Sequence, residues 1–460
     1  MIDWFKKNKI IVVLFFLALL PRLIFMLVAF FTLGDHGFIK GADIYLDAGL
    51  NLLRHGVFTN SSILPLVPDS FPAPGYPILL GISWLIIPKY LFIVFWQNIL
   101  YSLFIVLVYK FARLFFNNFI SLGAALLMIF EPFSFFWSNV VMTETPFLLF
   151  FMACIYFLAL FWKEQKWKFI IYSAILLALA SLVRQVAVFF FLVVLASSAV
   201  MLWSKISWSK LAKYLFVYLI VFLIVVSPWA IRNKLLAGNF AISNQTQFLY
   251  FHFVMPEILS LSKKIPLAEA ETYLEDLAVR KARTDSFDQI RWKDEYVIVL
   301  REVNFSVIKD QPFTYFKWHL IGTLPLFTDS GWMNILSFWN VNLGQASSVN
   351  LSSSLIQGDW SKLSSTLKDN PFFLVRLLGI VFWILINIIA FWGLILMLLK
   401  RDLFRISLAM SMIIGYFVFV SSWAAMARTR LPFQPFLFIF LAYAGYVFYT
   451  KFKLKRGVNI

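Results

Sequence analysis

Two carboxylates in the polar stretch between Gly34 and Tyr90 are the first side chains of this chain that could carry out chemistry. Asp43 and Asp47 lie four residues apart, so on a helix they share one side and flank an apolar stripe that runs from Leu46 to Val57. We interpret the stretch as a catalytic loop whose helix rests on a membrane surface. The spacing also suits a plain helix in which Asp43 is the N-cap and Asp47 pairs with a neighbouring cation, and that alternative stays open.

A third carboxylate, Glu144, stands at the junction between two hydrophobic segments, just before Thr145 and Pro146. An acid at this junction lies on the predicted outer side of the membrane, where the third hydrophobic span ends and the fourth begins. The same pattern is also typical of a helix start, since negative charge in the first turn suits the helix dipole and proline suits the first helical positions.

Several cations lie at the predicted outer ends of membrane spans, where the orientation rule for membrane proteins disfavours positive charge. They are Arg184, Arg232, Lys234, Arg428 and Arg430. Guanidinium groups at headgroup level can grip a phosphate or pyrophosphate through paired hydrogen bonds, so we expect a phosphate-bearing substrate. Contact with ordinary lipid phosphates explains any one of these residues, but it explains several on one face less well.

The elements that must position these residues are membrane helices, because the composition leaves no other class. Of the 460 residues, 61% are hydrophobic, 19% aromatic and only 14% charged, so the chain must use lipid as its solvent. Hydrophobic runs repeatedly approach the roughly 20 residues that cross a bilayer as a helix. The net charge of +17 comes from short Lys and Arg clusters between these runs, which orient membrane proteins, and we expect no nucleic-acid partner. The single Cys154 excludes a disulfide framework.

The positions of the basic clusters predict an all-α polytopic membrane fold with both termini cytoplasmic. Ten spans are expected, at residues 10–32, 91–109, 117–137, 145–162, 169–183, 186–203, 214–230, 372–399, 406–424 and 431–449. The hydrophobic run from Tyr76 to Ile87 is too short to cross a bilayer, so we expect it to lie in the membrane plane or to re-enter the membrane.

Three regions follow from this pattern. An N-terminal transmembrane module at 1–230 contains the catalytic first outer loop at 33–90. An outer segment at 231–370 is expected to be mostly helical and partly interfacial, and the C-terminal transmembrane helices occupy 371–460.

The motifs of the chain also resemble a known family when they are taken in order. They are Asp43-Ile-Tyr, Ala48-Gly-Leu-Asn-Leu-Leu, Pro74-Gly-Tyr-Pro, Met142-Thr-Glu-Thr, Leu182-Val-Arg, Pro228-Trp-Ala-Ile-Arg-Asn and Arg428-Thr-Arg-Leu-Pro-Phe-Gln-Pro. From about residue 10 to 450, their order and spacing are similar to those of the protein O-mannosyltransferase-like membrane glycosyltransferases (family 39) of the GT-C superfamily.

This resemblance implies a GT-C-like bundle and a transferase that moves a sugar from a polyprenyl-phosphate donor to a hydroxyl of a glycan, lipid or protein acceptor. It implies an active site on the periplasmic or external side of the cell membrane, with Asp43 as the catalytic carboxylate and Glu144 in the same cleft. Such a transfer needs charge withdrawn at the leaving phosphate and a base for the acceptor hydroxyl, so we assign the arginines to the phosphate and Asp43 to an inverting attack. Asp47, Arg54 and Tyr76 complete the predicted substrate site.

Two departures from the family pattern affect this site. Relatives often carry a cation just before the Pro-Gly-Tyr-Pro element, where this chain has Phe71-Pro-Ala, so Arg54 or Lys40 would have to substitute. Many relatives pair two acids in the first loop, whereas Ile44 follows Asp43 here. A divalent cation that bridges the catalytic carboxylates and the donor phosphate stays an open alternative, which no ligand spacing supports.

Two other functions remain open on the sequence alone. A transporter or flippase for lipid-linked glycans would keep ionisable groups and broken helices in mid-membrane and often shows internal repeats. Here the charges gather at the outer rim and no repeat is visible. A non-catalytic relative that acts as an assembly partner is the second alternative.

Overall fold

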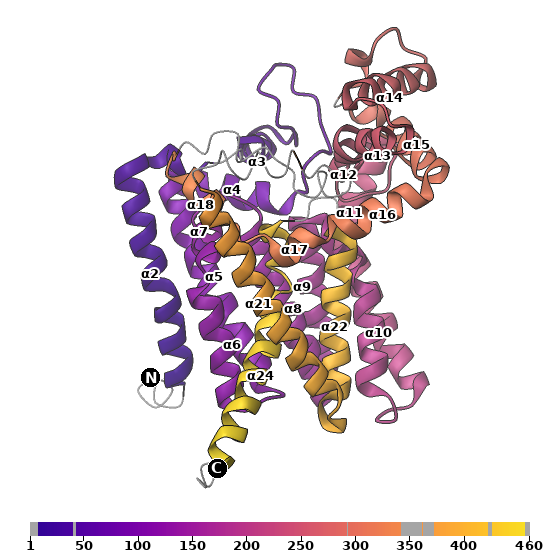
Figure 1. The fold of residues 1–460 in the computed structure, drawn as a ribbon. Coiled ribbons are helices and arrows are strands. Elements are labelled where there is room, and N and C mark those ends of the chain that lie inside the picture. The colour runs from indigo at the N-terminus through magenta and orange to yellow at the C-terminus, as the bar shows by residue number, and fades with distance from the viewer. Residues whose placement is uncertain are drawn as a thin grey trace.

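The computed structural model describes residues 8–39, 43–291, 293–341, 361, 372–421 and 426–455, without the side chains of residues 43, 373, 454 and 455. Every regular element within these ranges is helical, which confirms the predicted all-α polytopic fold. The helices form an upright bundle, and a group of shorter helices lies at one end of it (Figure 1).

The bundle contains eight of the ten spans that hydropathy predicted, and a bent pair of helices matches a ninth. Among the described residues, eight helical stretches are long and apolar enough to cross a membrane: α2 (Lys9–Leu33), α5 (Tyr90–Arg113), α8 (Glu144–Glu164), η2 with α10 (Gln185–Phe190 and Phe191–Leu202), α11 (Trp208–Ala237), α21 (Phe373–Leu398), α22 (Arg401–Ser421) and α24 (Gln434–Lys455). A ninth consists of α6 (Asn118–Phe130) and α7 (Pro132–Ser138), which meet at a bend of 63°. The tenth predicted span, 169–183, corresponds to α9 (Trp167–Val183), which packs between α8 and α11 but with 17 residues is shorter than the other spans.

The bend between α6 and α7 has a local cause. Pro132 occupies the first turn of α7, where its missing N–H is no loss, and the Glu131 carboxylate caps that helix. Its oxygens accept hydrogen bonds from the backbone N–H groups of Phe133 at 3.1 Å and Ser134 at 2.8 Å. The backbone N–H groups that the break leaves without helical partners therefore find hydrogen-bond acceptors inside the bundle.

The first outer loop folds as two crossing helices, α3 (Asp43–His55) and α4 (Gly75–Ile86), after a short turn of helix, η1 (Asp35–Phe38). Their backbones meet at Gly49 and Gly81, since a Cβ atom at Gly49 would lie 1.9 Å from the carbonyl oxygen of Pro77. With 12 residues, α4 is too short to cross the membrane, as predicted. This close contact with α4 fixes the orientation of α3 relative to the bundle.

The outer helices follow α11, and all but the last two, which pack against the bundle, gather beside the first outer loop (Figure 1). They are α12 (Gln245–Leu249), η3 (Tyr250–Val254), α13 (Met255–Lys263), α14 (Leu267–Ala282), η4 (Phe287–Gln289), η5 (Asp294–Tyr296), α15 (Val297–Asp310), α16 (Pro312–Gly322), α17 (Leu324–Thr328) and α18 (Trp332–Phe338). The helices from α12 to α16 enclose a second hydrophobic core, which includes Phe248, Met255 and Leu300. The Ser-rich stretch 347–366 lies outside the described residues except for Ser361.

A polar cluster, here called the outer joint, ties the first outer loop to the outer helices. The Asp294 carboxylate accepts hydrogen bonds from the backbone N–H and the hydroxyl of Ser70, and the Asn244 side chain donates to that hydroxyl at 2.6 Å. Arg232, near the end of α11, donates to the carbonyl oxygen of Asp69 at 2.7 Å. The outer joint thus holds the loop between the bundle and the outer helices.

Candidate active site

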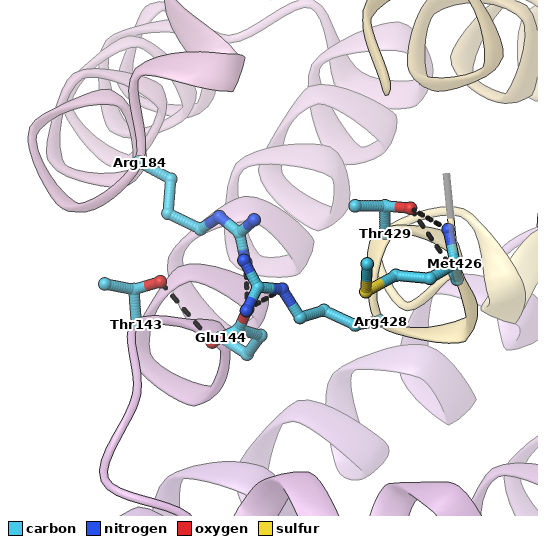
Figure 2. A network of polar contacts seen from close by, with 6 residues as sticks. All are labelled: Thr143, Glu144, Arg184, Met426, Arg428 and Thr429. Carbon is cyan, nitrogen blue, oxygen red and sulfur yellow. Dashed lines mark hydrogen bonds and ion pairs between the residues drawn. The ribbon is translucent and has the colours of Figure 1, made fainter. Parts of the chain in front are cut away.

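Glu144 lies at the centre of the most concentrated charge cluster among the described residues. It is the first residue of α8, and its side chain is only 2% exposed. Arg184 donates a hydrogen bond from Nη1 to Glu144 Oε1 at 2.6 Å, and Arg428 Nε forms an ion pair with the same oxygen at 3.1 Å. Figure 2 shows both guanidinium groups converging on this carboxylate. The Thr143 hydroxyl contacts the other oxygen, Oε2, at 3.4 Å.

Arg184 is positioned by the end of α9 and by the start of α4. Its backbone N–H caps α9 by donating to the carbonyl oxygen of Ala180 at 2.8 Å, and its cation lies at the helix end that favours positive charge. A Cβ atom at Gly75 would lie 2.9 Å from the backbone of Leu182. The glycine of the Pro-Gly-Tyr-Pro element thus allows α4 to reach the residues just before Arg184.

Two tyrosines of the first outer loop lie beside this cluster. The rings of Tyr45 and Tyr76 pack edge to face at 5.5 Å, and the Tyr76 hydroxyl donates to the side-chain oxygen of Gln97 at 2.8 Å. Burial raises the pKa of the Tyr45 hydroxyl, and the negative charge of Glu144 raises it further, whereas the neighbouring Arg184 and Arg428 oppose that shift. Tyr45 is therefore a neutral hydroxyl within electrostatic reach of Glu144 and its arginines.

The structure brings only part of the sequence-predicted site together. Glu144, Arg184, Arg428 and Tyr76 lie close to one another, with Tyr45 as an addition that the Asp-Ile-Tyr motif contained without an assigned role. Asp43 begins α3, two residues before Tyr45, and its side chain lies outside the described residues, as does Lys40.

The other predicted substrate-binding residues have different surroundings. Asp47 and Arg54 lie on the exposed surface of α3. Arg232 is engaged in the outer joint, where it also stacks over Trp229 at 4.6 Å. Arg430 is fully buried over the Trp383 ring and donates to two backbone carbonyl groups. In the sequence, all four outer arginines lie at predicted outer ends of spans. In the structure, only Arg184 and Arg428 of these four form ion pairs with Glu144.

The described side chains around Glu144 oppose a divalent cation at its carboxylate. Within the described part of the chain, no group of three or more His, Cys, Asp or Glu residues could hold a metal ion. The Oε1 atom of Glu144 already meets two guanidinium groups, whose positive charge opposes a cation at that oxygen.

The fold and the cluster together define a class, a multi-pass helical membrane protein with a polar charge cluster that carries Glu144. Residues 72–231 match the sequence model of a family described as dolichyl-phosphate-mannose-protein mannosyltransferase. This match confirms the resemblance to the protein O-mannosyltransferase-like GT-C family over the region that carries α4, Glu144 and Arg184. No curated protein sequence matches the chain.

One solved structure supports the fold assignment. The archaeal oligosaccharyltransferase AglB from Archaeoglobus fulgidus, in complex with an inhibitory peptide and a dolichol-phosphate, superposes with a TM-score of 0.51 at 14% identity. The match covers 99% of this chain and 52% of that chain, so this chain spans about half the length of the archaeal protein. The apo form of an Archaeoglobus fulgidus oligosaccharyltransferase gives a TM-score of 0.48, also at 14% identity and with coverage of 99% and 52%.

Proposed function

We propose that this protein is an inverting glycosyltransferase that moves a sugar from a polyprenyl-phosphate donor to an acceptor hydroxyl on the outer side of the cell membrane. The observation that carries the proposal is the pairing of Arg184 and Arg428 on the buried Glu144, beside the first outer loop. The family match over residues 72–231 supports the reaction class. The solved AglB complex contains a dolichol-phosphate, which supports a lipid-linked donor.

The charge balance of the cluster suits a phosphate. Two guanidinium groups and one carboxylate sum to +1 (+1 +1 −1), so positive charge remains for an anion. Glu144 is almost fully buried, whereas Arg184 and Arg428 keep 18% and 31% of their side chains exposed. We assign Glu144 as the residue that orients the arginines, and the arginines as the groups that stabilise charge on the leaving phosphate.

The transfer step follows from these assignments. The acceptor oxygen attacks the anomeric carbon on the face opposite the phosphate, the new C–O bond forms as the C–O bond to phosphate breaks, and the configuration inverts. The polyprenyl phosphate leaves with the bonding electron pair, toward Arg184 and Arg428. The proton of the acceptor hydroxyl passes to the carboxylate of Asp43, which we assign as the base. Asp43 begins α3 two residues before Tyr45, which lies within electrostatic reach of Glu144, and this position supports the assignment.

We also propose on which side of the membrane the charge cluster lies. The first residues of α2 and the last residues of α24 lie at the end of the bundle opposite α3, α4 and the outer helices (Figure 1). The Lys and Arg clusters between spans favour that end as cytoplasmic. The charge cluster would then face the periplasm or the exterior.

The test is a transfer assay with purified protein and a panel of radiolabelled polyprenyl-phosphate sugars, with glycan, lipid and peptide acceptors. We expect Asp43→Asn to abolish transfer while the protein stays folded, because an amide cannot take up the proton. The matched control is Asp288→Asn, the same change at an exposed site in the outer helices. Undiminished transfer by Asp43→Asn refutes the role of Asp43. Movement of the labelled donor across the bilayer without transfer would instead indicate a flippase.

A further inference from the structure

The turn after α17 contacts the short helix that carries Arg428. Asp329 follows Thr328, and its Oδ1 accepts a hydrogen bond from the backbone N–H of Gly331 at 2.9 Å. Its Oδ2 accepts one from the backbone N–H of Ala427 at 2.9 Å, across about a hundred residues of sequence. Gly331 has a φ of +70° and packs against the Phe133 ring, so the turn depends on glycine.

The same turn also binds the C-terminal end of that helix. The helix is α23 (Ala427–Arg430), and Arg430 donates from Nη1 to the carbonyl oxygens of Leu326 at 2.9 Å and Asp329 at 2.8 Å. Its guanidinium lies over the Trp383 ring, 3.4 Å from the centroid. The turn therefore holds the first and the last residue of α23, and Arg428 lies between these two anchors.

We propose that Asp329 is a positioning residue for Arg428. A helix of one turn gains too few hydrogen bonds to hold its own direction, so outside contacts must set it. Met426, which precedes α23, and Thr429 exchange two hydrogen bonds (Figure 2), and the contacts of Ala427 and Arg430 with the turn at Asp329 hold the helix from outside. Asp329 thereby aims the Arg428 guanidinium at Glu144, on the opposite side of the site from Arg184. The consequence for phosphate binding rests on the proposed function.

The experiment is a double-mutant cycle on phosphate binding, which needs no knowledge of the sugar or the acceptor. The probe is a polyprenyl monophosphate in nanodiscs, and the neutral polyprenol of equal length is the reference ligand. Dissociation constants are measured for the wild type, Asp329→Ala, Arg428→Ala and the double variant. Ser330→Ala is the matched control, because its hydroxyl bonds within the turn, to the N–H of Trp332, and makes no described contact with α23. The apparent Tm of each variant is recorded in parallel.

We expect Arg428→Ala and Asp329→Ala each to weaken binding of the monophosphate about tenfold, with binding of the polyprenol unchanged. The double variant should bind no worse than Arg428→Ala alone, because a positioning residue has no further effect once its target is gone. Ser330→Ala should bind like the wild type. If Asp329→Ala does not fold, Asp329→Asn is run through the same cycle. The amide nitrogen that replaces one carboxylate oxygen cannot accept a hydrogen bond, so one of the two N–H groups loses its partner and a partial, equally non-additive loss is expected.

The outcomes separate the inference from the proposed function. Normal binding by Arg428→Ala overturns both, because the arginine would then have no part in holding phosphate. Weak binding by Arg428→Ala with normal binding by the Asp329 variant overturns the inference and leaves the function standing. If the two losses of affinity multiply in the double variant, the inference about Asp329 is also overturned, because Asp329 would then act independently of Arg428.

Discussion

At the scale of single residues, the burial of Glu144 explains why two arginines can share a site in an apolar protein. A cation at the edge of a membrane bundle needs a partner, and a carboxylate that is 2% exposed interacts more strongly than one in water. The N-terminal end of α8 adds a favourable dipole for the negative charge.

We expect Glu144→Gln to reduce transfer from the polyprenyl-phosphate donor by roughly a hundredfold, because the amide keeps the shape but leaves two arginines without their counter-ion. Initial rates with the donor that the wild type prefers are the measurement. Glu164→Gln is the control, since the exposed ion pair of Glu164 with Lys166 should contribute little. Equal rates for Glu144→Gln and the wild type would remove Glu144 from the site.

At the scale of elements, the crossing of α3 and α4 depends on two small residues. A Cβ atom at Gly49 would meet the carbonyl group of Pro77, and one at Gly81 would lie 2.9 Å from the backbone of Gly49. Backbone atoms cannot rotate away as a flexible side chain can. The helices that carry Tyr45 and Tyr76 would have to separate, and their hydroxyls would shift relative to Glu144.

We therefore expect Gly49→Ala to destabilise the protein by about 1–3 kcal/mol, the usual range for overpacking, and to lower the transfer rate as well. The apparent Tm in detergent measures the first effect. Gly445→Ala makes the same change in α24 at a position with no atom within 4 Å, so its Tm should match that of the wild type. A Gly49→Ala variant as stable as this control would mean that α3 and α4 do not meet at Gly49.

At the scale of the whole molecule, the outer joint makes the contact between loop and outer helices sensitive to pH. Burial raises the pKa of Asp294 above its ordinary value of 3.8, and burial also raises that of the nearby Asp69. The folded state therefore binds these protons more tightly than the unfolded state. Acidification stabilises the joint as the pH falls through the folded pKa, and the gain is complete below 3.8.

The Asp294→Asn variant has no ionisable carboxyl group at position 294, so it should lack the stability that the wild type gains on acidification through this group. The measurement is the apparent Tm from neutral pH to about pH 4, near the ordinary pKa of an aspartate. The wild type should gain stability relative to the variant as the pH falls, with Asp288→Asn following the wild type. Parallel curves for the wild type and Asp294→Asn would show that Asp294 does not titrate in the joint.

The orientation of the whole molecule can be tested with cysteine labelling. Cys154 is buried, so the natural chain should react little with a membrane-impermeant maleimide. We expect Ser62→Cys, exposed in the first outer loop, to react in intact cells, and Ser209→Cys, exposed at the start of α11, to react only after permeabilisation. The opposite pattern would place the charge cluster on the cytoplasmic side.

The sequence by itself determined the membrane class, the positions of the spans and the short α4, because the hydropathy of a stretch and the length needed to cross a bilayer are local properties. It also pointed to Glu144 and the outer arginines. Only the tertiary structure decided that Arg184 and Arg428 reach Glu144, while Arg232 and Arg430 bind backbone carbonyl groups. The four arginines have the same chemistry and similar places at span ends. What separates them is which distant element packs beside each, and no local pattern encodes that.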